Sequence, residues 1–457
     1  MHTRTPQVID TPDIYHAGRE PLSLALIDAR NHTLHLLALL QEATGSARLV
    51  PAGMADTADT AAMAATAVMS TLSRDEITEP PLWLAGHIAW FSEWWIGRNT
   101  QRALGAQGPE RPARVPALEP QADAWWNPQL IAPAARWSQA LPDLDVTRAY
   151  LLETLESSLD MLEKADETDA GLYFYRVALL HEDLRGEQLV VLAQTLGLRL
   201  PTEPMPGALR LDLGPTPAQR EALLLPATEW TLGAAPTDGA AAAGFALPQE
   251  SGSLRVAVPE FEIDAQPITW QQFAEFVDDS GYDRPELWQP EGWRWLSNQA
   301  DMARRAPRHI EQISLARQGA GGGAVLQRRF GRMVRVAGQQ SAVHLSWWEA
   351  DAWARWAGRR LATEVEWEIA AHNAAHRGFR WGDVHEWTAG TLRPWPGFQA
   401  TPWSIGSVFD PRPAFGEARV LRGASFATRS RLASPKRRSF AWPGTDAGFY
   451  GARTCAL

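Results

Sequence analysis

The chain of 457 residues is 45% hydrophobic and 21% charged, an ordinary balance for a globular protein of two or three domains. Its formal net charge of -10 argues against a surface that follows nucleic-acid phosphates, so we expect no nucleic acid as a partner. The single cysteine, Cys455, excludes an internal disulfide, a multi-cysteine zinc site and two-cysteine redox chemistry. Residues 1–20 lack the apolar core of a signal peptide, and no apolar run approaches membrane-spanning length. We therefore expect a cytoplasmic protein that does not contact a membrane.

The first 198 residues contain four segments with the apolar spacing of amphipathic helices. These segments are residues 22–45, 80–97, 146–165 and 171–198. The second starts on two prolines, which suit the first turn of a helix, and the first ends on a glycine. Four such helices predict a four-helix bundle over residues 1–198, with the proline-rich segment 107–142 as a long crossover.

The pattern changes after the fourth segment. Residues 199–219 contain prolines and no sustained period, which is typical of a linker, and 234–244 is a low-complexity loop. Residues 220–457 contain short alternating runs separated by glycine, proline and aspartate, with convincing helices only at 268–281 and 346–358. We expect an α+β protein in which a loop-rich mixed domain follows the helical bundle.

The stretch HEDLRGEQL, which begins at His181, gathers a histidine, three acids and an arginine on the fourth helix. On a helix of 3.6 residues per turn, Arg185 shares the face of His181, whereas Asp183 and Glu187 point roughly 200° and 240° away. The acids are therefore not natural co-ligands of His181, and Arg185 stands where the second histidine of an HxxxH pair would be. His87, on an aromatic helix, is by itself more typical of a satisfied core residue than of a ligand. From the residues alone, a metal site, an altered copy of one and an ordinary helical face all stay open.

Four motifs of the C-terminal part occur in the order found in the formylglycine-generating-enzyme-like, or sulfatase-modifying-factor, fold. They are FEIDAQPITWQQFAEFVDDSGY (261–282), HLSWWEADAWARWAGRRLATEVEWEIAA (344–371), WGDVHEWTAG (381–390) and VLRGASFATRS (420–430). The resemblance covers about residues 220–457 and implies a loop-rich, C-type-lectin-like domain. The formylglycine-generating enzymes themselves bind copper through a cysteine pair, which a chain with one cysteine does not provide.

In the ergothioneine-biosynthesis sulfoxide synthases and the selenoneine synthases, a domain of this fold follows a DinB-like four-helix bundle. The present chain resembles these enzymes in both parts. PLWLAGHIAWFSEWW resembles the segment that donates the first iron-binding histidine, which gives that role to His87. HEDLRGEQL resembles the helix that donates the other two, so His181 takes the second position and Arg185 the third-ligand position. The resemblance implies a three-histidine non-haem Fe(II) site with open positions for O2 and a thiolate or selenolate. This chain offers two of those histidines.

The resemblance also implies a set of substrate-binding positions near the C-terminus. They are Ser439, Phe440, Ala441, Trp442, Thr445, Leu392 and Trp387. Leu392 stands where the γ-glutamylcysteine users have a tyrosine, so no hydroxyl is available there to donate a proton. Ala441 and Thr445 replace the family's aspartate and arginine, which favours an uncharged donor over an amino-acid-like thiol. Phe440 and Trp442 are the aromatic side chains expected to face the quaternary ammonium of hercynine, which is trimethylated histidine.

The segment WWIGRNTQRALG and the tryptophan-rich stretch after it look more like the selenoneine synthases than like the thiol users. We therefore expect Fe(II)- and O2-dependent oxidative C–Se bond formation between a selenosugar and the imidazole of hercynine, with a selenoxide as first product. Two alternatives stay open: a C–S bond-forming sulfoxide synthase with a thiol donor, and a metal-free small-molecule binder with Arg185 in the metal's place. His385 is expected either at the cleft or on the surface, and the catalytic proton donor is not identified.

Overall fold

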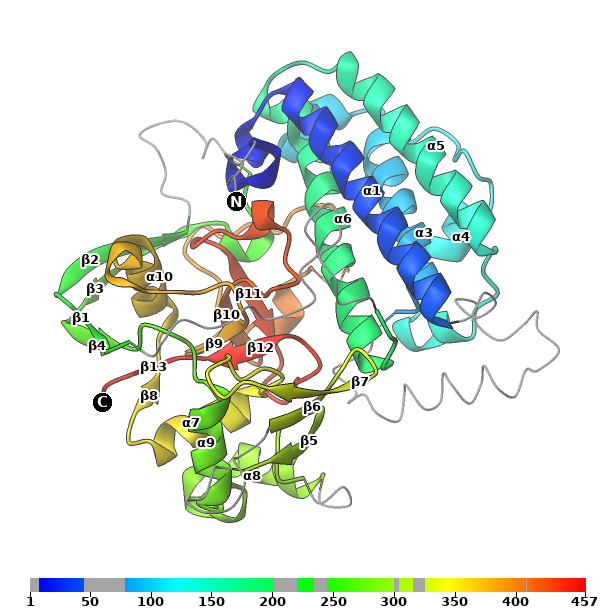
Figure 1. Ribbon diagram of the computed structural model, residues 1–457. Helices are drawn as coiled ribbons and strands as arrows, with labels where there is room; N and C mark the ends of the chain where they lie inside the picture. Colours follow the sequence, from blue (N-terminus) through cyan, green and yellow to red (C-terminus); the bar gives the residue numbers. More distant parts are fainter. Residues whose placement is uncertain are drawn as a thin grey trace, which may run out of the picture.

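The computed structural model describes residues 8–44, 79–200, 220–233, 245–299, 304–314, 325–405, 407 and 409–457. The predicted loop at 234–244 and all but the first two residues of the predicted linker at 199–219 lie outside these ranges. Two parts are visible in Figure 1, a group of long helices and a mixed part of short strands and helices, and α6 lies between them.

The helical part contains the four long helices that the sequence predicts. They are α1 (Arg19–Thr44), α3 (Pro81–Ser92), α5 (Leu144–Glu163) and α6 (Asp169–Thr195), with the short α4 (Ala122–Trp126) in the crossover. Single turns complete this part: η1 (Val8–Asp10), η2 (Pro12–His16), η3 (Glu93–Gly97), η4 (Arg102–Gln107) and η5 (Pro133–Trp137). Asp143 and Thr168 cap the N-termini of α5 and α6, and the side chain of each accepts a hydrogen bond from the backbone N–H three residues later. Every residue of α3 is buried, which explains its almost uniformly apolar sequence.

The described residues of the C-terminal part form four small sheets. Their strands are β1 (Leu223–Leu225), β2 (Thr228–Gly233), β3 (Ser253–Val258), β4 (Phe261–Ile263), β5 (Ile310–Ile313), β6 (Val325–Arg329), β7 (Arg332–Val336), β8 (Arg360–Leu361), β9 (His385–Thr391), β10 (Arg419–Gly423), β11 (Arg438–Ala441), β12 (Tyr450–Ala452) and β13 (Thr454–Cys455). The sheet orders are β1-β4-β13-β8, β11-β10-β9-β12, β2-β3 and β5-β6-β7. In the second sheet β9 pairs with β10 antiparallel and with β12 parallel. This mixture of helices and sheets confirms the predicted α+β class.

The helices of the C-terminal part differ from the prediction in number. They are α7 (Trp270–Asp278), α8 (Pro290–Ser297), α9 (Trp347–Trp356) and α10 (Glu364–Asn373), with single turns η6 (Pro248–Glu250), η7 (Gly281–Asp283), η8 (Pro285–Leu287), η10 (Ala375–Arg377), η11 (Arg412–Ala414) and η12 (Ser430–Leu432). The sequence predicted only α7 and α9. α8 buries just Gly292 and Leu296, which is too few residues for a visible period. α10 was missed although Thr363 and Glu366 form a capping box at its start.

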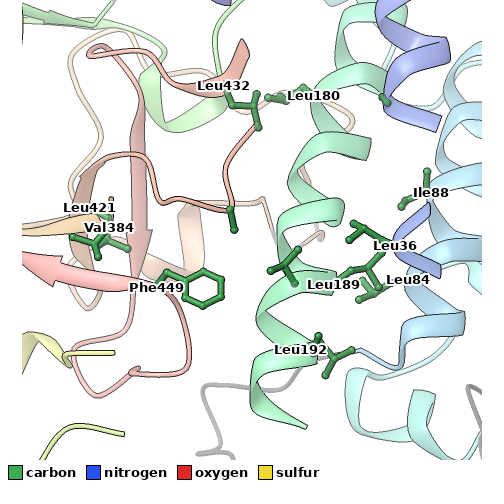
Figure 2. Packing of buried hydrophobic residues seen from close by; sticks show 14 of the residues in the cluster. Leu36, Leu84, Ile88, Leu180, Leu189, Leu192, Val384, Leu421, Leu432 and Phe449 are labelled. Atoms are coloured by element: carbon green, nitrogen blue, oxygen red, sulfur yellow. The ribbon is translucent and has the colours of Figure 1, made fainter. Parts of the chain in front are cut away.

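The two parts share one hydrophobic core, and α6 runs through it. Figure 2 shows bundle residues on one side of α6 and residues of the C-terminal part on the other. The labelled residues of the bundle are Leu36, Leu84 and Ile88, and those of α6 are Leu180, Leu189 and Leu192. The labelled residues of the C-terminal part are Val384, Leu421, Leu432 and Phe449. α6 is therefore buried on both flanks, so its charged side chains need partners inside the protein. None of the helices within the described ranges has the length and apolar character needed to cross a membrane.

Candidate active site between the bundle and the C-terminal part

The fold brings the two predicted iron-ligand histidines together. His87 of α3 and His181 of α6 face each other edge to face, with 5.1 Å between ring centroids. Both side chains are almost completely buried. Phe91, one turn after His87, stacks flat on the ring of His181 with centroids 3.8 Å apart. The pair is thus held inside an aromatic cage and not on a solvated face.

Hydrogen bonds define the tautomers of this pair. His87 Nδ1 lies 3.0 Å from the backbone oxygen of Trp126, so Nδ1 donates and Nε2 keeps its lone pair. His181 Nε2 accepts from Arg185 Nε at 3.3 Å, so the proton of His181 is on Nδ1, which has no hydrogen-bond partner among the described residues. Burial, together with the charge of Arg185, holds the pKa of each histidine well below its usual value. Both imidazoles are therefore neutral at ordinary pH.

Arg185 belongs to a second buried cluster directly beside the histidines. Its Nη1 donates to Gln188 Oε1 at 2.8 Å and lies 3.6 Å from a carboxylate oxygen of Glu79. Glu79 also receives a hydrogen bond from Arg136 at 2.7 Å, so one carboxylate serves two guanidiniums. Burial lowers the pKa of Arg185, and Glu79 opposes that effect. The cluster as a whole keeps an excess of positive charge next to the two neutral imidazoles.

This donor set does not fit the three-histidine iron that the resemblance implies. The lone pair of His181 Nε2 is already used by the N–H of Arg185, and a guanidinium has no lone pair to offer a cation. The acids of the same helix turn away, Asp183 toward Arg431 and Glu187 toward His385. No group of three or more histidine, cysteine, aspartate or glutamate side chains suited to a metal occurs within the ranges that the structure describes.

Two cavities flank the cluster. A small one of about 40 Å³ is lined by both histidines and by the aromatic side chains of Trp90, Phe91 and Trp403. A larger one of about 200 Å³ lies between α6 and the sheet β11-β10-β9-β12; we name it the interface cavity. It is lined by Leu184, Glu187, Gln188, Val191, Leu247, Gln249, His385, Phe409, Leu421, Arg437, Ser439, Phe440, Gly448, Phe449 and Tyr450. Phe409 and Gln188 connect it to the cluster, because each also contacts Arg185.

Only part of the predicted substrate-binding set reaches the interface cavity. Ser439 and Phe440 line it, whereas the other predicted positions are absent from its described wall. Leu392 is fully buried in a separate apolar cluster with Ala418 and Val420. The remaining positions that the structure does not bring to the cavity are Ala441, Trp442, Thr445 and Trp387.

The sequence does not single out most of the lining residues as site residues, among them the polar side chains of Gln188, Gln249 and Arg437, and it leaves His385 open between cleft and surface. The structure places His385 in the cavity wall, 7% exposed. Gln188 had a usable signal, because it lies one turn after Arg185 on the same helical face. Arg437 and Gln249 had none, because neither belongs to a helix or strand with a readable period.

Glu187 joins α6 to the C-terminal part. One carboxylate oxygen accepts hydrogen bonds from His385 Nε2 at 2.8 Å, Ser425 Oγ at 2.7 Å and Thr428 Oγ1 at 2.9 Å. Burial would raise the pKa of this carboxyl, but the charge and hydrogen bond of His385, the charge of Arg437 and the hydroxyl of Ser425 outweigh it and lower the pKa to about 2. The acid is therefore a fixed anion in the cavity wall.

Asp183 makes the second polar link across the interface. It receives two hydrogen bonds from the guanidinium of Arg431, at 2.6 Å and 2.8 Å, and both side chains are buried. Arg431 also donates to Asp28 of α1 at 2.7 Å. Asp183 and Glu187, the two acids that point away from His181, thus hold the two parts of the protein together.

Sequence comparison agrees with this two-part architecture. Residues 214–383 match the family described as "Sulfatase-modifying factor enzyme 1-like domain". The chain is similar to the hercynine oxygenase of Mycolicibacterium smegmatis, with 28% identity over 82% of this chain and 91% of that protein. It is similar in the same way to the hercynine oxygenase of Mycobacterium tuberculosis, with 27% identity over 83% of this chain and 91% of that protein. A formylglycine-generating enzyme of Streptomyces coelicolor is 28% identical, but over only 51% of this chain and 87% of its own length. The likeness to the hercynine oxygenases extends through the helical part as well as the C-terminal domain.

Proposed function

We propose that this chain binds hercynine, the compound named in its relatives, in the interface cavity. The observation that carries this proposal is the position of the cavity. It lies between the two parts of a chain that aligns with hercynine oxygenases along most of its length. Phe409, Phe440 and Phe449 contribute aromatic rings to its wall, and such rings attract a quaternary ammonium group. Glu187 adds a fixed negative charge to the same wall.

The similarity to hercynine oxygenases supports a reaction in which a sulfur or selenium donor is joined to the imidazole ring of hercynine and O2 is the oxidant. We propose a selenosugar as that donor and a selenoxide as the first product, with a thiol donor and a sulfoxide as the alternative. An uncharged donor is favoured by the sequence resemblance alone, because Ala441 and Thr445 stand where the thiol users have an aspartate and an arginine. The acid next in the chain, Asp446, is already paired with Arg304 and Arg308.

A metal-free binding protein is the second candidate, and one contact favours it. Arg185 Nε donates to His181 Nε2, the nitrogen that a metal would need. With Arg185 in place, the cluster beside the cavity carries a permanent positive charge of its own. Hercynine binding is common to both candidates, and iron content separates them.

The test compares the parent with Arg185→His and His181→Ala, each purified without oxygen, supplied with Fe(II) and assayed for bound iron. Arg136→His is the matched control, because Arg136 shares Glu79 with Arg185 but makes no contact with His181. Hercynine binding is measured by calorimetry, and product formation with selenosugar and thiol donors by mass spectrometry. We expect the parent to bind hercynine whichever candidate holds, and its iron content compared with that of Arg185→His separates the synthase from the metal-free binder.

Near-stoichiometric iron in the parent that disappears in His181→Ala, together with a coupled product, would establish the synthase and exclude the metal-free binder. Iron gained only in Arg185→His would establish the binder. Absence of hercynine binding in every variant would refute both candidates.

A further inference from the structure

Arg437 is a buried cation in the wall of the interface cavity, one residue before β11. It is only 7% exposed. It also lines a neighbouring cavity of about 250 Å³, so it separates two hollow spaces at the domain interface. Buried guanidiniums normally lie against carboxylates, because desolvating the charge is costly without a partner.

The hydrogen bonds of Arg437 fall short of what its guanidinium can make. Nε donates to Ser439 Oγ at 3.5 Å and Nη1 donates to the backbone oxygen of Leu432 at 3.4 Å, and both bonds are long. No other hydrogen bond and no ion pair of Arg437 occurs among the described residues. A guanidinium has five N–H donors, so most of this capacity is unused. The neighbouring Arg438 shows the usual solution, with two hydrogen bonds to the carboxylate of Glu364.

The nearest acids act on Arg437 only through space. Glu187 already accepts three hydrogen bonds from side chains of the C-terminal part. Glu250 accepts from the backbone N–H groups of Arg438 and Leu247. Neither carboxylate makes an ion pair with Arg437, so the described protein leaves an anion-binding group in the cavity wall.

We propose that Arg437 binds the carboxylate of a small zwitterionic ligand, an amino-acid betaine with an imidazole ring, in the interface cavity. This rests on the proposed function and specifies how the ligand is oriented. The cationic end of the ligand lies toward Glu187 and the aromatic rings, and its carboxylate lies toward Arg437. A monoanion is favoured over a phosphate, because Glu187 in the same wall repels a second negative charge. Arg437 thereby selects ligands that have the carboxylate.

Three probes separate the two ends of the ligand. Hercynine carries both charges, N,N,N-trimethylhistamine lacks the carboxylate, and 3-(imidazol-4-yl)propionate lacks the ammonium. Each is titrated by calorimetry into the full-length parent, Arg437→Gln and Arg437→Lys, with Arg255→Gln as a control at an exposed arginine of β3. A charge-assisted contact is expected to be worth about 10- to 100-fold in affinity.

We expect the parent to prefer hercynine over trimethylhistamine by that factor, and Arg437→Gln to abolish the preference without weakening trimethylhistamine. Arg437→Lys should keep part of the preference, and Arg255→Gln should change nothing. Arg437→Gln should also lose little resistance to urea, because it removes an incompletely bonded buried charge and gives up only a through-space attraction to Glu187. A purely structural arginine would instead lose stability and weaken both ligands equally.

The failure of this inference and that of the proposed function give different results. If imidazolylpropionate binds in an Arg437-dependent manner and hercynine does not bind, the carboxylate site stands and the hercynine proposal falls. If hercynine binds with no preference over trimethylhistamine, the hercynine proposal stands and Arg437 is not its anchor. If the parent binds no carboxylate-bearing probe, the carboxylate site is refuted.

Discussion

Replacing Glu187 by glutamine should weaken the attachment of α6 to the C-terminal part and change how stability depends on pH. The folded-state pKa of about 2 lies below the unfolded value of 4.5. The charged carboxylate therefore contributes stability that is fully present above pH 4.5 and is lost as the pH falls toward 2. At ~1.4 kcal/mol per pKa unit, the shift corresponds to about 3 kcal/mol. Roughly 2 kcal/mol of this should disappear between pH 7 and pH 3.

Glutamine keeps an oxygen that can accept from His385, Ser425 and Thr428, but it removes the charge that strengthens those bonds. Glu187→Gln should therefore lower the free energy of unfolding by about 2 to 3 kcal/mol at pH 7. Its stability should also fall less steeply than that of the parent as the pH drops from 7 to 3. Urea unfolding followed by tryptophan fluorescence at a series of pH values measures both effects.

Glu182→Gln is the matched control. Glu182 is a buried glutamate of the same helix, but it pairs with Arg30 and Thr33 inside the bundle and makes no polar contact with the C-terminal part. Glu182→Gln should destabilise the protein but leave the sensitivity of the junction between the two parts to limited proteolysis unchanged. Glu187→Gln should increase that sensitivity. Equal stability and equal pH dependence of Glu187→Gln and the parent would refute the reasoning.

Two further pairs of variants test the interface and the histidine pocket. Asp183→Asn weakens a fully buried ion pair and should lower the free energy of unfolding by about 3 kcal/mol, whereas Asp28→Asn, on a side chain 34% exposed, should cost about 1 kcal/mol or less. Equal losses in urea titrations would contradict the assignment of Asp183 as the main link. Gly86→Ala places a Cβ against the indole of Trp126 and should cost about 1 to 3 kcal/mol, whereas a Cβ at Gly186 of α6 meets only ordinary contacts. Gly186→Ala should therefore stabilise the helix by about 0.5 to 1 kcal/mol. Compared with the parent, the midpoint of thermal unfolding should be lower for Gly86→Ala and higher for Gly186→Ala.

The sequence by itself determined the elements that depend on neighbouring residues. Helical spacing located the four long helices of the bundle, because apolar residues three and four apart must share one face whatever the helix packs against. The same geometry separated Arg185 from Asp183 and Glu187 on α6, and the structure keeps that separation. The order of the C-terminal motifs led to the family that the relatives now support.

Only the tertiary structure decided what those side chains meet. Glu187 of α6 and His385 of β9 lie 198 residues apart in the chain and meet across the interface of the two parts, a contact that no local period encodes. Leu392, predicted at the substrate, is buried in an apolar cluster, because burial depends on which elements cover a strand and not on the strand's own sequence. The sequence shows that residue 437 is an arginine with five N–H donors. Only the packed interface shows that few hydrogen-bond acceptors lie within their reach.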